Sequence, residues 1–377
     1  MKNICCSIFS IILLCNCTNQ TTEEILKNKI QGSWVDIHAK KVRKEQVIAP
    51  FKIPFGLNFQ NDSVDFFKQF TKYTRDSLTN KMQFNAFAGF ISYQIKADSL
   101  FITNPLKNNI EFKYTIDASR EDTLLLKKND TIRYTLERLA KPQKDTLFFD
   151  QIVLARSGCF GSCPIMNISV KKDGTVLFYG ERFTTTIGLY TAKLSPQLTK
   201  HLFKKFENAQ ISKVKPYYSV GHSDDETVST SFLKNGKIIK TVRDYGKAGT
   251  NELLWAYQSI ENIYKLITLT TNEIRNQQLV FNHYYIHDKK MWLPLKKSES
   301  FILWNALQKA EITTKTFQPK FTLDFKKLRA RKDETLKVET DGQFFKYYLK
   351  NGKTIAYDIG YNFITKNFTK EDFRELK

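Results

Sequence analysis

The sequence predicts a β-rich α+β fold with few helices, and three observations support this. Aromatic residues make up 14% of the chain, whereas only 15 Gly and 9 Pro occur among 377 residues, a balance that suits pleated, half-buried sheet. Residues 90–95 (FISYQI) alternate with a period of two, as strands with one buried face do. Because a domain averages roughly 150 residues, the length predicts two or three domains.

The N-terminal residues, MKNICCSIFSIILLCNC, predict an exported chain. Lys2 gives a basic start, and an apolar run follows at 8–14. This run is too short to cross a bilayer, which takes about 20 residues.

The segment Leu14-Cys15-Asn16-Cys17 resembles the cleavage motif of a bacterial lipoprotein. The resemblance implies that residues 1–16 are a signal peptide and that the sulfur of Cys17 carries lipid. Cys15 is the alternative lipid site, because Asn16 departs from the usual small residue. An ordinary secretory leader or a buried helix is the alternative to a lipoprotein leader.

A lipoprotein leader implies a protein of the bacterial cell envelope, anchored by lipid in the outer membrane or facing the periplasm. Membrane lipid is then its first partner. Residues 17–29 would be the tether, ending in a short helix over 22–29.

Residues 30–139 predict an antiparallel meander that closes as a barrel or a sandwich. Gly32-Ser33-Trp34 and this meander resemble a lipocalin-like β-barrel, in which the Trp plugs one end. The resemblance implies an interior that could carry an apolar small ligand. A barrel filled by its own Phe and Tyr side chains is the alternative, and the small size of the barrel favours it.

Residues 146–267 predict an α+β domain of hairpins packed on amphipathic helices, after a polar linker at 140–145. One hairpin turns on Asp173-Gly174, a type I′ signal, and another on Asn235-Gly236. Ser195 and Thr250 are the predicted N-caps of two helices with apolar stripes.

The turn Cys159-Phe160-Gly161 then Cys163-Pro164, with Asp173-Gly174-Thr175 and residues 235–246 (NGKIIKTVRDYG), resembles a bacterial family marked by a CFG-x-CP turn, domain of unknown function 6438. Met166-Asn167 stand where that family tends to have an aromatic residue. The family has no established activity, so the resemblance implies a module and no function.

Residues 272–377 predict a second α+β domain that is a diverged partial copy of the preceding one. The helix pattern at 298–314 parallels 195–213, and the hairpin pattern at 345–362 parallels 229–246. Convergent use of a helix followed by a hairpin is the alternative, since Asn-Gly is the commonest hairpin signal. The pattern TKEDFREL at 369–376 predicts a last short helix.

Removal of the leader would leave Cys159 and Cys163 as the remaining cysteines besides Cys17. An even number of cysteines in an exported chain favours a disulfide, and Gly161 permits the turn that a disulfide needs at this spacing. A thiol-redox centre would need a helix N-terminus here, and a zinc site would need four ligands. A reduced structural pair and a redox or metal site are the alternatives.

The segment GHSDDE gathers His222, Asp224, Asp225 and Glu226 in a predicted loop. It is the best candidate for a ligand or cation site, although it lacks the ligand spacing of a calcium loop. A solvated acidic turn is the alternative that the sequence favours.

The pair His283 and His287 would chelate a metal on a helix, but its neighbours predict a strand, in which the two lie about 13 Å apart. The sequence therefore assigns no metal, no cofactor and no catalytic residue.

The formal net charge of +21 favours anionic headgroups or acidic glycans as partners, and export argues against nucleic acid. The short motifs of hydrolases, nucleotide-binding proteins and zinc proteases are absent from the sequence. The prediction is a non-catalytic binding or scaffolding protein at the membrane surface, with no protein partner named. An apolar-ligand carrier and a hydrolase or thiol-redox protein using the cysteine turn are the alternatives.

Overall fold

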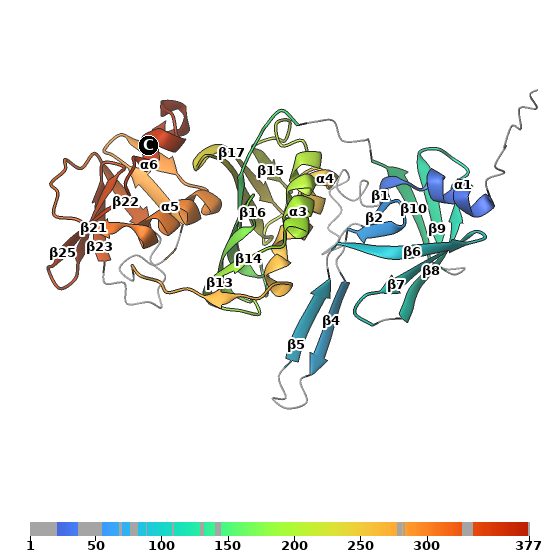
Figure 1. Cartoon of the computed structure of the whole chain (residues 1–377). Coiled ribbons are helices and arrows are strands. Elements are labelled where there is room, and N and C mark those ends of the chain that lie inside the picture. The colour runs from blue at the N-terminus through green and yellow to red at the C-terminus, as the bar shows by residue number, and fades with distance from the viewer. Residues whose placement is uncertain are drawn as a thin grey trace, which may run out of the picture.

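The computed structural model describes residues 21–36, 55–67, 70–75, 82–87, 89–107, 109–128, 132–139, 145–276, 281, 283–325 and 335–375. The predicted signal peptide (1–16) and the lipid site Cys17 lie outside these residues. Figure 1 shows a barrel, a middle sheet and a C-terminal sheet that follow one another along the molecule. None of the described helices is long and apolar enough to cross a membrane.

The N-terminal part is a closed antiparallel barrel with strand order β1-β10-β9-β8-β7-β6-β3-β2, preceded by helix α1 (Thr22–Lys29). Its strands are β1 (Gly32–Asp36), β2 (Gly56–Gln60), β3 (Ser63–Phe66), β6 (Phe90–Lys96), β7 (Ser99–Asn104), β8 (Asn109–Asp117), β9 (Thr123–Lys127) and β10 (Arg133–Arg138). A separate hairpin, β4 (Phe70–Arg75) and β5 (Met82–Phe87), projects from it (Figure 1).

Trp34 anchors the barrel. Its side chain is buried, its indole N–H donates to the carbonyl of Ile30 at 2.7 Å, and the Arg138 guanidinium lies 4.1 Å from its ring centroid. A closed barrel with a buried Trp at this position is consistent with the lipocalin-like resemblance.

The middle sheet has eight strands in the order β15-β17-β16-β11-β12-β13-β14-β18. They are β11 (Gln151–Arg156), β12 (Ile165–Lys171), β13 (Thr175–Arg182), β14 (Gly188–Lys193), β15 (Tyr217–Ser219), β16 (Thr227–Lys234), β17 (Lys237–Tyr245) and β18 (Thr270–Thr271). Helices α3 (Pro196–Asn208) and α4 (Asn251–Glu261) cover the face toward the barrel, and the short 3-10 helix η1 (Ile263–Lys265) follows α4 (Figure 1). Ser195 and Thr250 cap α3 and α4 as predicted.

The C-terminal sheet also has eight strands, in the order β21-β25-β24-β23-β22-β19-β20-β26. They are β19 (Tyr284–His287), β20 (Met291–Pro294), β21 (Glu311–Ile312), β22 (Phe321–Phe325), β23 (Thr335–Thr340), β24 (Phe344–Leu349), β25 (Thr354–Asp358) and β26 (Arg374–Glu375). Helices α5 (Lys297–Lys309) and α6 (Phe363–Asn367) accompany this sheet.

Helix α5 lies between the middle and C-terminal sheets. One apolar core takes side chains from α5, from the C-terminal sheet and from the middle sheet, the last being Val153, Tyr179, Leu189, Leu233 and Ile238. A seam of hydroxyls fixes the helix start, because Ser298 Oγ lies 2.7 Å from the Oγ atoms of both Ser229 and Ser231. The middle sheet is therefore covered on both faces.

The barrel is attached to α3 and α4 by a buried ion pair and by aromatic rings. The Lys205 ammonium bonds the Asp65 carboxylate and lies 4.4 Å from the ring centroid of Trp255. The Phe67 ring also packs on Trp255, with 5.2 Å between the two ring centroids. Val35 and Phe67 thus join the core of the middle sheet.

The turn at residues 172–174 differs from the prediction. A type I′ turn needs two central residues with positive φ, as Asn235 (52°) and Gly236 (69°) have. At the first hairpin only Gly174 is positive, at 86°, and the loop has one more residue. The Asp173 carboxylate accepts the N–H of Thr175 at 2.8 Å and stabilises this longer turn.

The predicted helix at 369–376 is wrong. Its capping box forms, but the helix stops after the 3-10 turn Lys370–Asp372. The chain then pairs with β20 through Arg374 and Trp292. Eight residues form a marginal helix, and the strand edge offers backbone partners in its place.

The proposed duplication stays a prediction. In both sheets a helix is followed by a short edge strand that pairs with the last hairpin strand, β15 with β17 and β21 with β25. The first of these pairings is parallel and the second antiparallel.

Asp65→Asn should lower the free energy of unfolding by about 3 kcal/mol, because it leaves the buried Lys205 ammonium without its counter-charge. Urea unfolding followed by tryptophan fluorescence measures the change. The control Glu207→Gln removes the exposed partner of Lys204 on α3 and should cost less than about 0.5 kcal/mol. Equal losses in the two variants would contradict the role of Asp65.

Candidate functional site

The loop 157–164, which joins β11 to β12, carries the CFG-x-CP turn. Cys159 and Cys163 form a disulfide with a Cα–Cα distance of 5.6 Å. Gly161 has φ +137°, a conformation that L side chains rarely adopt, and so lets the chain reverse between the cysteines. Of the three alternatives for this pair, the structure contains the disulfide. The Phe160 side chain at the tip is 85% exposed.

Hydrogen bonds attach this loop to the neighbouring segment 224–227. The Phe160 N–H donates to the carbonyl of Asp224 at 2.8 Å. At the start of the loop, the Ser157 N–H donates to the carbonyl of Thr227 at 2.9 Å, and Ser157 Oγ accepts the Thr227 N–H at 2.8 Å. The loop is thus held at its base, at its tip and by the disulfide.

Below the loop, four charged side chains form a closed circuit of ion pairs, which we call the Arg156 ring: Arg156, Glu226, Lys247 and Glu261. Arg156 Nε and Nη2 lie 2.7 and 2.6 Å from Glu226 Oε2, and Arg156 Nη1 lies 3.5 Å from Glu261 Oε2. The Lys247 ammonium closes the ring, 3.2 Å from Glu226 and 2.9 Å from Glu261.

Arg156, Glu226 and Glu261 are buried and Lys247 is partly exposed, and the attraction among these charges offsets the cost of burial. Burial alone would lower the pKa of Arg156, but Glu261 and Glu226 outweigh it and hold that pKa above its ordinary value. Burial alone would raise the pKa of Glu226, but Lys247 and Arg156 outweigh it and lower that pKa. Arg156 and Glu226 therefore both remain charged at neutral pH.

Lys297 of α5 reaches the same place from the opposite face of the middle sheet. Its ammonium donates to the backbone carbonyl of Arg156 at 2.7 Å and lies 2.6 Å from the Glu181 carboxylate. Asn167 donates to the same Glu181 oxygen at 2.8 Å. Burial lowers the pKa of Lys297, while Glu181 acts in the other direction. The base of the disulfide loop is thus held from both sides of the sheet.

The structure separates the residues predicted as a ligand or cation loop. His222 Nε2 pairs with Asp225 at 3.2 Å, Glu226 belongs to the Arg156 ring, and Asp224 is exposed. These carboxylates do not converge on one point. Within the described parts of the chain, no three His, Cys, Asp or Glu side chains are placed to hold a metal ion.

The histidine pair HYYIH lies in a strand context, as predicted, because β19 spans Tyr284–His287. His287 Nε2 lies 3.0 Å from the Asp324 carboxylate, and the His283 ring stacks on Tyr285 at 5.2 Å.

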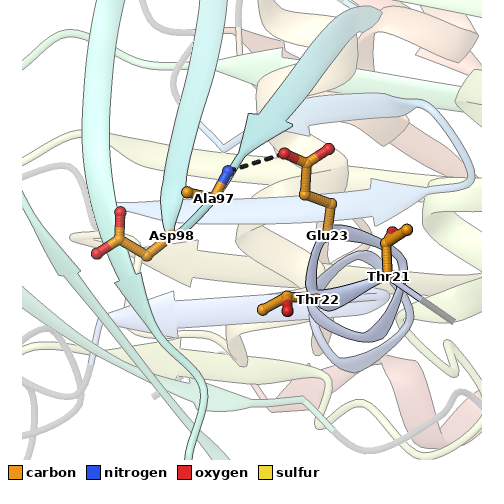
Figure 2. Close-up of a pocket in the computed structure, with 5 residues that line it drawn as sticks. All are labelled: Thr21, Thr22, Glu23, Ala97 and Asp98. Atoms are coloured by element: carbon orange, nitrogen blue, oxygen red, sulfur yellow. Dashed lines mark hydrogen bonds between the residues drawn. The ribbon is translucent and has the colours of Figure 1, made fainter.

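The barrel interior is packed with its own side chains. Phe55, Tyr114 and Tyr134 form an aromatic group in which the Phe55 and Tyr134 rings stack at 4.3 Å. Figure 2 shows a depression at the outside, where α1 begins beside the β6–β7 turn, lined by Thr21, Thr22, Glu23, Ala97 and Asp98. The Glu23 carboxylate there accepts the Ala97 N–H at 2.9 Å. The filled barrel and the apolar-ligand carrier both stay predictions.

Sequence reasoning missed the Arg156 ring and Lys297. One signal was present in the strand QIVLAR, where Arg156 occupies the same alternating face as the buried Ile152 and Leu154. An arginine on the core face of a strand needs buried acidic partners.

Arg156→Met should lower the free energy of unfolding by about 3 kcal/mol, because two buried carboxylates then share only Lys247. Adding Glu261→Gln to this variant should recover part of the lost free energy of unfolding, since the Glu226 carboxylate and the Lys247 ammonium then balance each other. Chemical denaturation measures both. The control Arg182→Met removes an exposed guanidinium, and a loss as large as that of Arg156→Met would contradict the ring.

Lys265 gives a pH test. Burial, and then the charge of Arg156, lower its pKa from 10.5 to about 8 in the folded chain. Between about pH 8 and pH 10.5, Lys265 is protonated in the unfolded chain but neutral in the folded chain. The free energy of unfolding therefore rises with pH across this range. Below about pH 8 the buried charge of Lys265 destabilises the folded chain by its full amount.

Lys265→Met should therefore raise the free energy of unfolding at neutral pH by about 1 kcal/mol, a figure reduced for the partial exposure of the group. This gain should vanish as the pH rises through the window. Urea unfolding of both proteins across the pH range measures the difference, with the exposed Lys200→Met as the control for loss of one charge. A gain that does not change with pH would contradict this account.

Comparison with known proteins agrees with the CFG-x-CP resemblance. Residues 150–264 match the family model described as Domain of unknown function (DUF6438). No curated protein and no solved structure matches the chain. The matched segment runs from the start of β11 to η1 and contains the disulfide loop and every member of the Arg156 ring. The part of the chain that matches this family model is therefore β11 to β17 of the middle sheet, with α3 and α4.

Proposed function

We propose that the protein is a lipid-anchored, non-catalytic binding or scaffolding protein of the bacterial cell envelope. In this proposal a lipocalin-like barrel (30–139) and two α+β modules (146–267 and 272–377) form the part that is presented at the membrane surface. One observation supports this proposal most strongly. The cysteines and buried carboxylates around the CFG-x-CP turn, which could otherwise react, form a disulfide and ion pairs that stabilise the fold.

A hydrolytic function would need a free nucleophile or a carboxylate that substrate can reach, and the reduced form of a thiol-redox centre would need a reactive thiolate. The two cysteines are bonded to each other, so neither is a thiolate. Glu226 and Glu261 are buried and bond Arg156 and Lys247. These groups stabilise the fold of the turn, which supports binding over chemistry.

The anchor in this proposal is the lipid on Cys17, with the leader 1–16 removed. The full chain has a net charge of +21, of which the leader removes only Lys2, so the tethered protein attracts anionic headgroups or acidic glycans over a long range that salt shortens. Export sets nucleic acid aside as a partner.

Thiol titration of the mature protein, native and in denaturant, tests the non-catalytic role. With Cys17 acylated and Cys159 bonded to Cys163, no thiol should react in either condition. A thiol that reacts in the native protein would favour the thiol-redox alternative and overturn this proposal.

Membrane fractionation tests the anchor. Cys17→Ala removes the lipid site, so the protein should appear in the soluble fraction or as a precursor that keeps residues 1–16. Cys15→Ala is the matched control in the same segment and should leave the protein in the membrane fraction. The reverse result would place the lipid on Cys15, and no effect of either would contradict lipid anchoring.

A further inference from the structure

We propose that three loops at one end of the middle sheet form a docking surface for a protein segment that combines an apolar side chain with Lys or Arg. This inference rests on the proposed non-catalytic binding role and adds the place and the partner class. The loops are 157–164, 183–187 and 220–226, and we call them the loop surface.

Strand register places the three loops side by side. Ile165 at the start of β12 pairs with Arg182 at the end of β13, so the loops 157–164 and 183–187 leave the sheet as neighbours. The Phe160 N–H bonds the carbonyl of Asp224, which places 220–226 on the other flank. The disulfide loop is thus the central one.

The loop surface exposes large apolar side chains. Phe160 is 85% exposed, Ile187 55% and Phe183 42%. Single exposed apolar residues are common on proteins, but three on adjacent loops indicate an interaction site. Exposed aromatic side chains also dominate the binding energy of many interfaces.

These side chains stand on a rigid base. The disulfide and the bonds of Ser157 and Phe160 fix the central loop. In the loop 183–187, the Thr184 hydroxyl donates to the carbonyl of Thr186 at 2.7 Å, and the Tyr190 hydroxyl donates to the carbonyl of Ile187 at 3.0 Å. A preorganised surface loses little conformational entropy on binding.

The charge beside Phe160 selects the partner. Asp225 pairs with His222 and Glu226 lies in the Arg156 ring, whereas the Asp224 carboxylate is exposed and accepts a hydrogen bond from the Ser223 hydroxyl at 3.3 Å. Asp224 therefore offers a negative charge at the edge of an apolar surface. A Lys or Arg in the partner complements this carboxylate, which an anionic lipid headgroup does not.

Peptide selection tests the loop surface. A random peptide library displayed on phage is panned on the detergent-solubilised full chain, with Phe160→Ala as the counter-selected protein. Enriched peptides should carry an apolar residue next to Lys or Arg. In fluorescence anisotropy with the synthetic peptide, Phe160→Ala should weaken binding about tenfold and Asp224→Asn about threefold. Phe148→Ala, which removes an exposed Phe at the other end of β11, should change nothing.

Asn tolerates the left-handed backbone of residue 224, where φ is +71°, so Asp224→Asn removes the charge without disturbing the loop. Unchanged thermal unfolding of each variant verifies the fold. Enriched peptides without a basic residue, binding that survives Phe160→Ala, or no enrichment would overturn the proposal. The thiol titration is independent of this result and tests the non-catalytic role by itself.

A fluorine probe tests the competing occupants. Trifluoromethyl-phenylalanine is placed at position 160, or at position 148 as the control, and the full chain is mixed with vesicles of phosphatidylcholine and phosphatidylglycerol that contain a nitroxide lipid. Equal broadening at the two positions agrees with a protein partner, and stronger broadening at 160 would assign the surface to the membrane. Self-association in sedimentation that Phe160→Ala abolishes would assign it to a second copy of the chain.

Discussion

The Arg156 ring is the constraint on which the middle of this protein depends. An arginine buried at the end of a central strand is stable only if its charge is compensated and its donors are bonded. Glu226, Lys247 and Glu261 meet that requirement from three other segments: Glu226 directly precedes β16, Lys247 lies two residues after β17, and Glu261 is the last residue of α4. The disulfide loop starts at residue 157, directly after Arg156, so the ion pairs that position Arg156 also position the base of the loop.

At this end of the sheet, the disulfide restrains the loop itself and the ion pairs restrain its base. The ring of the disulfide is small, so by loop entropy it contributes only about 2 kcal/mol, and its main effect is local geometry. The ion pairs orient the base of the loop, and Lys297 connects that base to the C-terminal sheet through α5. A tip that displays Phe160 is therefore fixed relative to the whole protein.

Local signals predicted much of the fold. The caps Ser195 and Thr250, the Asn235-Gly236 turn and the cysteine pair are each encoded within a few residues, and the structure has all of them. Features built from distant segments were not predictable in this way. The Arg156 ring joins residues up to 105 positions apart, and α5 bonds the middle sheet through Ser298 and strand β19 of the C-terminal sheet through Ser300. The helix at 369–376 failed for the same reason, because a distant strand edge competed with it.

The two-sided role of α5 means that the family segment and the folding unit have different limits. A fragment ending at residue 264 would uncover Val153, Tyr179 and Leu233, which form an apolar face on the middle sheet. Any chain that carries this domain without a C-terminal sheet must cover the corresponding face with another helix, with a subunit, or with polar replacements. The second face of the sheet is thus the place where relatives of this domain have room to differ in what they assemble with.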